Sequence, residues 1–166
     1  MILPRHEIEE KGIVSEFIGE SQFQPCGVDL TLKEVQKIEG QGSIDFDNSE
    51  RVIPKGAPIL FEHSWVSLAP GTYKVIFNEY VKIPSDAAGF AYPRSSLTRS
   101  GAMLGLAVWD PGYQGRSEAL LIVANPAGLR LKKNAKIAQI TFAKLSSPAK
   151  TLYSGIYQGE NAEKKQ

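Results

Sequence analysis

The strand character of this chain is clearest in residues 72–83, which read TYKVIFNEYVKI. β-branched and aromatic residues dominate this run, and the sequence Pro84-Ser85-Asp86 that follows it is typical of a turn. A bounded run of this composition predicts a β-strand. Residues 72–83 therefore favour a fold that is built from strands.

Short apolar runs of the same kind lie on both sides of this segment. They occupy Val28–Val35, Val52–Ile53, Pro58–Phe61 and Ala119–Val123, and Gly, Pro and Asn residues separate them. Residues 129–142 read as an alternating strand, a Lys-Asn turn and a second strand. This alternation of short apolar runs and turn residues predicts an all-β barrel or jelly roll whose central strands form a meander of hairpins.

Two short helices are expected beside the strands. From Leu3 to about Ile18 the apolar residues recur at roughly helical spacing, with acidic residues near the start. The second helix lies in residues 93–101, PRSSLTRSG, where Ser is suited to capping a helix and Gly101 to ending it. Free N–H groups, two hydroxyls and a guanidinium at such a helix start could bind phosphate, although the same pattern also occurs for structural reasons alone.

The composition limits the class of protein. A length of 166 residues fits one domain, and 19 basic against 18 acidic residues argue against a general nucleic-acid binder. The single cysteine, Cys26, cannot form an internal disulfide, which favours a reducing compartment. No run approaches the ~20 apolar residues of a membrane span. We therefore expect a soluble, cytoplasmic protein, with a domain over residues 1–154 and a flexible, polar lid or tail over residues 155–166.

An acidic residue stands at the end of the apolar run Ala107-Val108-Trp109. Asp110 is followed by Pro111-Gly112-Tyr113, which predicts a small hairpin loop. Such a loop could read a nucleobase edge with its backbone, pack Tyr113 against a deoxyribose and activate a water with Asp110. Without further evidence, a turn-forming role is the simpler explanation of Asp110.

Five segments, in this order, resemble the motifs of the dUTPase and dCTP deaminase superfamily. They are PCGVDL at 25–30, PRSSL at 93–97, DPGYQG at 110–115, KIAQI at 136–140 and YSGIYQG at 153–159. The resemblance implies a distorted β jelly roll that assembles as a homotrimer, with each active site built from neighbouring subunits. It also implies a deoxynucleoside triphosphate substrate and a Mg²⁺ ion chelated mainly by the triphosphate, because His6 and His63 match no motif and no His/Cys ligand cluster is present.

The resemblance assigns two groups of site residues. The phosphates would be bound by Arg94, Ser95 and Ser96, with Arg99 as a further candidate, and Gln139 would reach the triphosphate. Asp110 would orient or deprotonate the attacking water, and Tyr113 would lie beneath the deoxyribose. Asp29 would contact the water shell of the metal, and Tyr157 and Gln158 would close over the nucleotide. From the residues alone, Asp29, Gln139 and Tyr157 could equally be structural.

One position separates the two reactions of the superfamily. Deaminases that resemble this chain carry a catalytic glutamate five residues after the glycine at 115, and this chain has Leu120 there. The nearest acid, Glu118, lies ~6–7 Å away along a strand, too far for the same proton transfer. The sequence therefore favours hydrolysis of dUTP to dUMP and pyrophosphate, a reaction that keeps uracil out of DNA. A dCTP deaminase, with or without the hydrolase activity, and a catalytically silent nucleotide-binding protein remain as alternatives, since the spacing from Arg94 to Asp110 is shorter than either branch leads us to expect.

Overall fold

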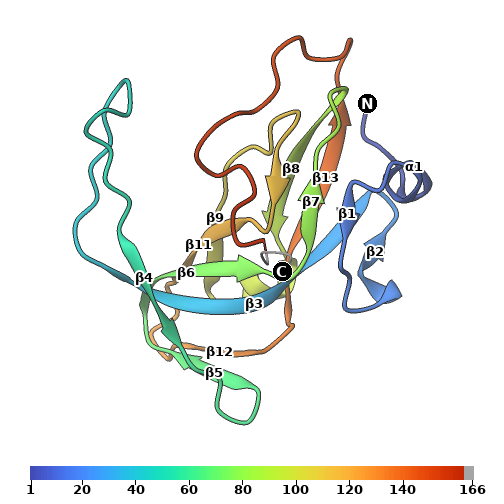
Figure 1. Cartoon of the computed structure of the whole chain (residues 1–166). Coiled ribbons are helices and arrows are strands. Elements are labelled where there is room, and N and C mark those ends of the chain that lie inside the picture. Colours follow the sequence, from blue (N-terminus) through green and yellow to red (C-terminus); the bar gives the residue numbers. More distant parts are fainter. Residues whose placement is uncertain (163–166) are drawn as a thin grey trace.

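β-strands are the main regular secondary structure in the computed structural model, which describes residues 1–162 (Figure 1). The helical elements are α1 (Arg5–Glu10), η1 (Glu20–Gln22) and α2 (Ser95–Arg99). The strands are β1 (Val14–Ser15), β2 (Phe23–Gln24), β3 (Gly27–Glu39), β4 (Lys55–Ile59), β5 (Trp65–Leu68), β6 (Gly71–Phe77), β7 (Tyr80–Lys82), β8 (Ala87–Pro93), β9 (Ala102–Gly105), β10 (Gln114–Gly115), β11 (Glu118–Val123), β12 (Leu129–Lys132) and β13 (Lys136–Lys144). The prediction of an all-β fold with two short helices is confirmed, and no helix within residues 1–162 is long and apolar enough to cross a membrane.

The largest sheet has the strand order β8-β13-β3-β6-β11-β9, with β2 and β4 also paired to β3. All of these pairs are antiparallel, and the sheet curls into a nearly closed barrel (Figure 1). Two smaller sheets have the orders β1-β7-β10 and β12-β5. The predicted meander of hairpins is therefore wrong, because most strands pair with partners that are distant in the sequence, as in a jelly roll. Residues 129–142 illustrate this, since β12 pairs with β5 while β13 pairs with β3 and β8.

Three predicted segments differ in detail from the structure. Helix α1 is shorter than Leu3–Ile18, because Gly12 with a φ of 59° ends the turn after it. Val52 forms only an isolated bridge with Ser43, so Val52–Ile53 is not a strand. Residues 72–83 form two strands instead of one, because Glu79 turns into the core between β6 and β7. There its carboxylate accepts hydrogen bonds from the Thr31 backbone at 2.8 Å and from Gln22 at 2.7 Å, and burial raises its pKa.

The core lies between the strands of the curled sheet. Alternate side chains of β3, β6, β11 and β13 point inward, and among the least exposed are Val28, Leu30, Leu32, Val75, Phe77, Leu121, Ile140 and Phe142. Burying a side chain of this size contributes about 1.5–3 kcal/mol. Because a shift by one residue would turn these side chains outward, the core fixes the register of β13, which carries Gln139, against its neighbours β3 and β8, and Arg94 directly follows β8.

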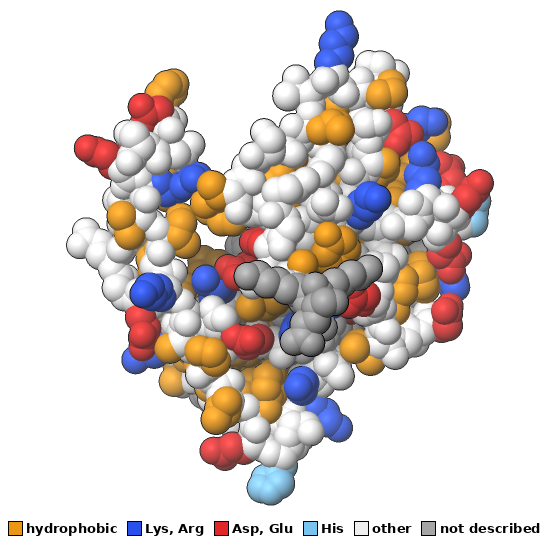
Figure 2. Space-filling view, viewed as in Figure 1, with side chains coloured by type: hydrophobic (Ala, Val, Ile, Leu, Met, Phe, Trp, Pro, Cys, Tyr) orange, Lys and Arg blue, Asp and Glu red, His pale blue; other side chains and the backbone are white. Residues whose placement is uncertain are grey.

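An arm formed by residues 40–54 projects from the body between β3 and β4 (Figure 1). Its exposed side chains include Ile44 and Phe46. A notch separates the arm from the body in the space-filling view (Figure 2). An apolar groove of about 530 Å³ lies between the base of the arm and the body, lined by residues that include Ile38, Ile53, Pro54, Leu106 and Leu120.

Candidate active site

The Asp110 turn is held rigidly by backbone hydrogen bonds. Tyr113 donates its N–H to the Asp110 carbonyl at 3.1 Å, and Gly112 has a φ of 88°, as the third position of a type II turn requires. Two hydrogen bonds with Ile83 attach the turn to the chain after β7, at 3.0 and 2.8 Å. The predicted turn is confirmed, but it does not join a hairpin, because β10 pairs with β7 and β9 pairs with β11.

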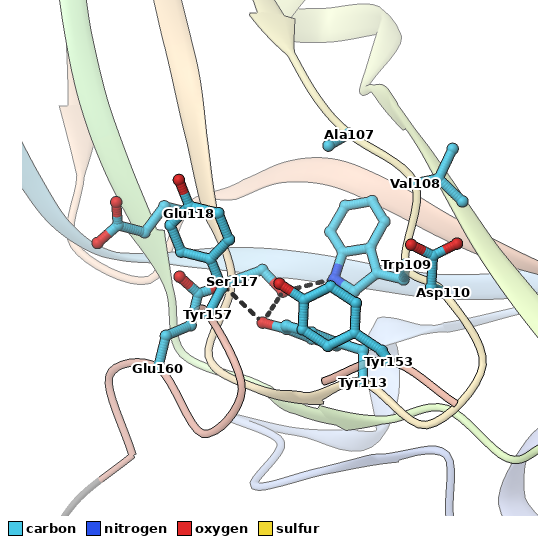
Figure 3. A pocket seen from close by; sticks show the side chains of 10 residues that line it. All are labelled: Ala107, Val108, Trp109, Asp110, Tyr113, Ser117, Glu118, Tyr153, Tyr157 and Glu160. Atoms are coloured by element: carbon cyan, nitrogen blue, oxygen red, sulfur yellow. Dashed lines mark hydrogen bonds between the residues drawn. The ribbon is translucent and has the colours of Figure 1, made fainter. Parts of the chain in front are cut away.

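A small cavity of about 90 Å³ opens beside this turn, and we refer to it as the Asp110 pocket. Its lining residues are Ala107, Val108, Trp109, Asp110, Tyr113, Ser117, Glu118, Tyr153, Tyr157 and Glu160. In Figure 3 the rings of Trp109, Tyr113 and Tyr153 lie between Asp110 on one side and Glu118 and Glu160 on the other. Asp110 is exposed, whereas Trp109 and Tyr113 are buried. The pocket therefore combines an aromatic wall with an accessible carboxylate.

The C-terminal segment is bound along the Asp110 turn. The Gln158 side chain accepts a hydrogen bond from the Gln114 backbone at 3.1 Å and donates one to the Gly112 carbonyl at 3.0 Å. The backbone of residues 159 and 160 also exchanges hydrogen bonds with Gln114 and Arg116. Tyr157 and Gln158 thus lie at the site, as a lid would require, while the division into a domain of residues 1–154 and a flexible lid of residues 155–166 stays a prediction. Residues 163–166 lie outside the described residues.

Leu120 and Glu118 occupy different environments on β11. Leu120 lies in the apolar groove beside the arm and is 36% exposed. Glu118 borders the Asp110 pocket, but its carboxylate forms an ion pair with Lys74 at 3.0 Å and accepts a hydrogen bond from Asn161 at 3.1 Å. The position at which a deaminase-like glutamate is expected is therefore apolar, and the nearest carboxylate is engaged by a cation and an amide.

A second, larger groove of about 570 Å³ lies at the other end of β8, and we call it the Arg94 groove. It is lined by Ile2, Cys26, Tyr92, Pro93, Arg94, Ser95, Gln139 and Thr141. The sheet register explains why distant motifs meet here, since Gln139 of β13 lies opposite Asp29 of β3 on one side and Tyr92 of β8 on the other. The segments at 25–30 and 136–140 therefore meet on the neighbouring strands β3 and β13, and the segment at 93–97 begins at the end of β8, on the other side of β13.

Arg94 is oriented by a buried carboxylate. Its guanidinium forms an ion pair with Asp29, whose side chain is only 1% exposed and also lies 3.5 Å from the Lys136 ammonium. Gln24 donates a further hydrogen bond to Asp29 at 3.0 Å. The structure thus places Asp29 behind Arg94, and a contact between Asp29 and the water shell of a metal stays a prediction.

Helix α2 begins at the mouth of this groove. Arg94 is the N-cap residue and Ser95 is the first helical residue, with no side-chain hydrogen bond at the cap. The predicted serine cap is therefore wrong, because Ser95 lies one position too late to bond the free N–H groups. Ser95, Ser96 and Arg99 are exposed, which leaves both hydroxyls accessible. Gly101, with a φ of 77°, ends the helix as predicted.

Two polar residues of the Asp110 pocket were not predicted from the sequence. Glu160 lies in a polar tail whose location depends on tertiary contacts, and Ser117 is an ordinary serine before a strand. In the structure the Tyr113 hydroxyl donates to Glu160 at 2.7 Å and lies 3.0 Å from the Ser117 hydroxyl. Burial raises the pKa of both Tyr113 and Glu160.

The Asp110 pocket and the Arg94 groove are separate within one chain. They share no lining residue. Gly89 of β8 exchanges backbone hydrogen bonds with Trp109, next to Asp110, whereas Arg94 follows five residues later. Five residues of extended strand span roughly 16 Å, so Asp110 and Arg94 of one chain lie at opposite ends of β8.

Among residues 1–162, no three His, Cys, Asp or Glu side chains come together in a way that could hold a metal ion.

Comparison with known proteins places this arrangement in a family. Residues 4–145 match the dCTP deaminase-like family. A protein of Methanosarcina acetivorans named "probable deoxyuridine 5'-triphosphate nucleotidohydrolase" is 57% identical over 145 residues, which cover 87% of this chain and 85% of the relative. A deoxyuridine 5'-triphosphate nucleotidohydrolase of Methanocaldococcus jannaschii is 48% identical over 146 residues, covering 86% and 90%. The crystal structure of a 2'-deoxycytidine 5'-triphosphate deaminase from Agrobacterium tumefaciens shares the fold with a TM-score of 0.62 at 17% identity, over 87% of this chain and 48% of that one.

Proposed function

Since this chain belongs to the dCTP deaminase-like family, which it matches over residues 4–145, we propose that it hydrolyses dUTP to dUMP and pyrophosphate. The observation that carries this proposal is the apolar environment of Leu120, at the position where a deaminase needs a general acid or base. The names of the relatives from Methanosarcina acetivorans and Methanocaldococcus jannaschii support the same reaction. Removal of dUTP would keep uracil out of DNA.

The proposed hydrolysis needs a positioned water and neutralised phosphate charge. Asp110 orients or deprotonates the water that attacks the α-phosphorus, and pyrophosphate leaves as the bond to the β-phosphate breaks. The rigid turn supports this role because it presents an exposed carboxylate at the edge of the pocket. Tyr113 lies beneath the deoxyribose, where a 2′-hydroxyl would clash. Tyr157 and Gln158 close over the nucleotide.

The triphosphate occupies the Arg94 groove in this proposal. Arg94 is preset by Asp29 for bidentate contact with phosphate oxygens. The exposed hydroxyls of Ser95 and Ser96 donate to the same group, Gln139 reaches it from β13, and Arg99 adds positive charge from the last turn of α2.

We further propose a homotrimer in which each site combines the Asp110 pocket of one subunit with the Arg94 groove of its neighbour. The separation of these two clusters within one chain supports this arrangement, because a water activated by Asp110 must lie within hydrogen-bond reach of the phosphate that it attacks. A head-to-tail contact repeated three times closes into a ring. The Asp110 pocket, at about 90 Å³, is also smaller than the about 300 Å³ or more of typical ligand sites.

Mg²⁺ is the proposed cofactor, brought to the site on the triphosphate. The described residues fit such an ion and not one held by the protein alone, since residues 1–162 offer no cluster of three metal-binding side chains and Asp29 is enclosed by Arg94 and Lys136. When bound, Mg²⁺ neutralises negative charge on the phosphate oxygens.

A product assay tests the proposed function against its alternatives. The wild-type protein with Mg²⁺ is expected to convert dUTP to dUMP and pyrophosphate and to release no ammonia from dCTP. Because Glu118 borders the pocket, deamination of dCTP that is lost in Glu118→Gln would instead establish a deaminase. Tight binding of dUTP without any turnover would show a silent binding protein and refute the hydrolase.

A further inference from the structure

A line of hydrogen bonds crosses the floor of the Asp110 pocket. The Trp109 indole N–H donates to the Ser117 hydroxyl, which lies 3.0 Å from the Tyr113 hydroxyl, and Tyr113 donates to Glu160 at 2.7 Å (Figure 3). Trp109, Tyr113 and Ser117 are 5%, 6% and 4% exposed. Because these groups are buried, water is a poor substitute for any bond that is removed.

The direction of these bonds follows from the chemistry of the groups at the two ends. An indole nitrogen can only donate, and the Tyr113 hydroxyl donates to Glu160. Ser117 therefore accepts from Trp109 and uses its single hydrogen to donate to Tyr113, which in turn uses its own hydrogen to donate to Glu160. Ser117 is the one residue in this line that joins the tryptophan beside Asp110 to the tyrosine of the turn.

The backbone of Ser117 gives its hydroxyl a fixed position. Its carbonyl accepts a hydrogen bond from the Phe77 N–H at 3.1 Å, which attaches the residue to the end of β6 in the core. The other close partner of the Tyr113 ring that we identify is Tyr153, in an edge contact with ring centroids 5.7 Å apart. An edge contact leaves a ring free to tilt, whereas a hydrogen bond at the hydroxyl fixes its far end.

We propose that Ser117 is a positioning residue that sets the selectivity of the site for deoxyribose over ribose. It acts through Tyr113, because its hydrogen bond holds the Tyr113 ring close enough to the sugar that a 2′-hydroxyl would clash with the ring. The proposal rests on the proposed function, because it takes Tyr113 as the residue beneath the sugar. Trp109 takes part by filling the space behind Ser117 and saturating its hydroxyl.

The test compares kcat/KM for dUTP and UTP in variants that remove one hydroxyl each. Ser117→Ala and Tyr113→Phe are both expected to lower the dUTP/UTP ratio by about tenfold or more. The double variant is expected to add little to Tyr113→Phe, because Tyr113→Phe already removes the bond between the two hydroxyls, together with the bond to Glu160. Loss of folded protein would lower both activities together and leave the ratio unchanged. Ser43→Ala, which removes a hydroxyl bonded to Glu50 in the arm, is the matched control and should keep the wild-type ratio.

A spectroscopic measurement separates this proposal from the proposed function. The sequence has two tryptophans, Trp65 and Trp109, so the indole N–H signals in a ¹H–¹⁵N spectrum report on the hydrogen bond directly. Ser117→Ala should shift the Trp109 signal and leave that of Trp65 in place, whether or not the wild type hydrolyses dUTP. An unmoved Trp109 signal would overturn the proposal, as would a wild-type dUTP/UTP ratio in folded Tyr113→Phe. Absence of dUTP hydrolysis in the wild type would instead refute the function on which it rests.

Discussion

Asp110→Asn is expected to lower kcat for dUTP hydrolysis by about 10²–10⁴-fold while KM changes little. The amide keeps the size of the carboxylate but cannot accept the proton of the attacking water. The turn should survive, because the hydrogen bonds that shape it join backbone atoms of Asp110, Gly112, Tyr113 and Ile83. Steady-state kinetics with dUTP and Mg²⁺ measure the effect.

Asp47→Asn is the matched control for this substitution. Asp47 is exposed in the arm, and its carboxylate accepts a hydrogen bond from the Ser49 backbone at 3.1 Å. The control variant should keep wild-type kinetics. If Asp110→Asn folds and keeps more than about a tenth of the wild-type kcat, Asp110 does not activate the water.

Arg94→Ala should reduce kcat/KM for dUTP by about 10²–10³-fold. The substitution removes a guanidinium that Asp29 holds in place to neutralise the triphosphate. Arg94→Lys keeps the charge but loses the planar pair of donors, so we expect it to recover only part of the activity. Comparing kcat/KM for the two variants separates the effect of the positive charge from the effect of the planar guanidinium donors.

The subunit should still fold without the Arg94 side chain. Asp29 retains the Lys136 ammonium at 3.5 Å and the Gln24 amide at 3.0 Å as partners. Arg51→Ala is a suitable control, because Arg51 lies in the arm and bonds only to the nearby Asn48 among the side-chain contacts that we identify. Wild-type activity in Arg94→Ala would remove the Arg94 groove from the proposed site.

Local sequence patterns predicted much of the fold, because strands and turns depend on neighbouring residues. The composition of residues 72–83 predicted strands, and Gly101 and Gly112 marked a helix end and a turn that the structure confirms. Pairing depends on contacts between distant residues, which a local pattern does not contain. The meander was therefore wrong, and the break at Glu79 became visible only through its buried partners Gln22 and Thr31.

The candidate site was likewise predicted in part from the sequence, and the rest required the structure. The motif order brought Arg94 and Gln139 into one groove because Gln139 lies on β13 and Arg94 directly follows the neighbouring strand β8, whose register with β13 is fixed. The contribution of Glu160 could not be predicted, since it arises from the return of the C-terminal segment to the Asp110 turn. That of Ser117 could not be predicted either, since it depends on how the Trp109 and Tyr113 side chains pack around its hydroxyl. Asp29 was expected near the metal, and its burial behind Arg94 became evident only in three dimensions.

A subunit-mixing experiment tests the central claim that a dUTP-hydrolysing site is built from two chains. Arg94→Ala and Asp110→Asn are each prepared, unfolded in urea, mixed in equal amounts and refolded together. A site needs intact Arg94 from one subunit and intact Asp110 from its neighbour, and random assembly supplies both at about a quarter of the sites. The account predicts that two nearly inactive proteins regain dUTP hydrolysis at about this fraction of the wild-type rate. A mixture that assembles into trimers but stays as inactive as its two components would contradict it.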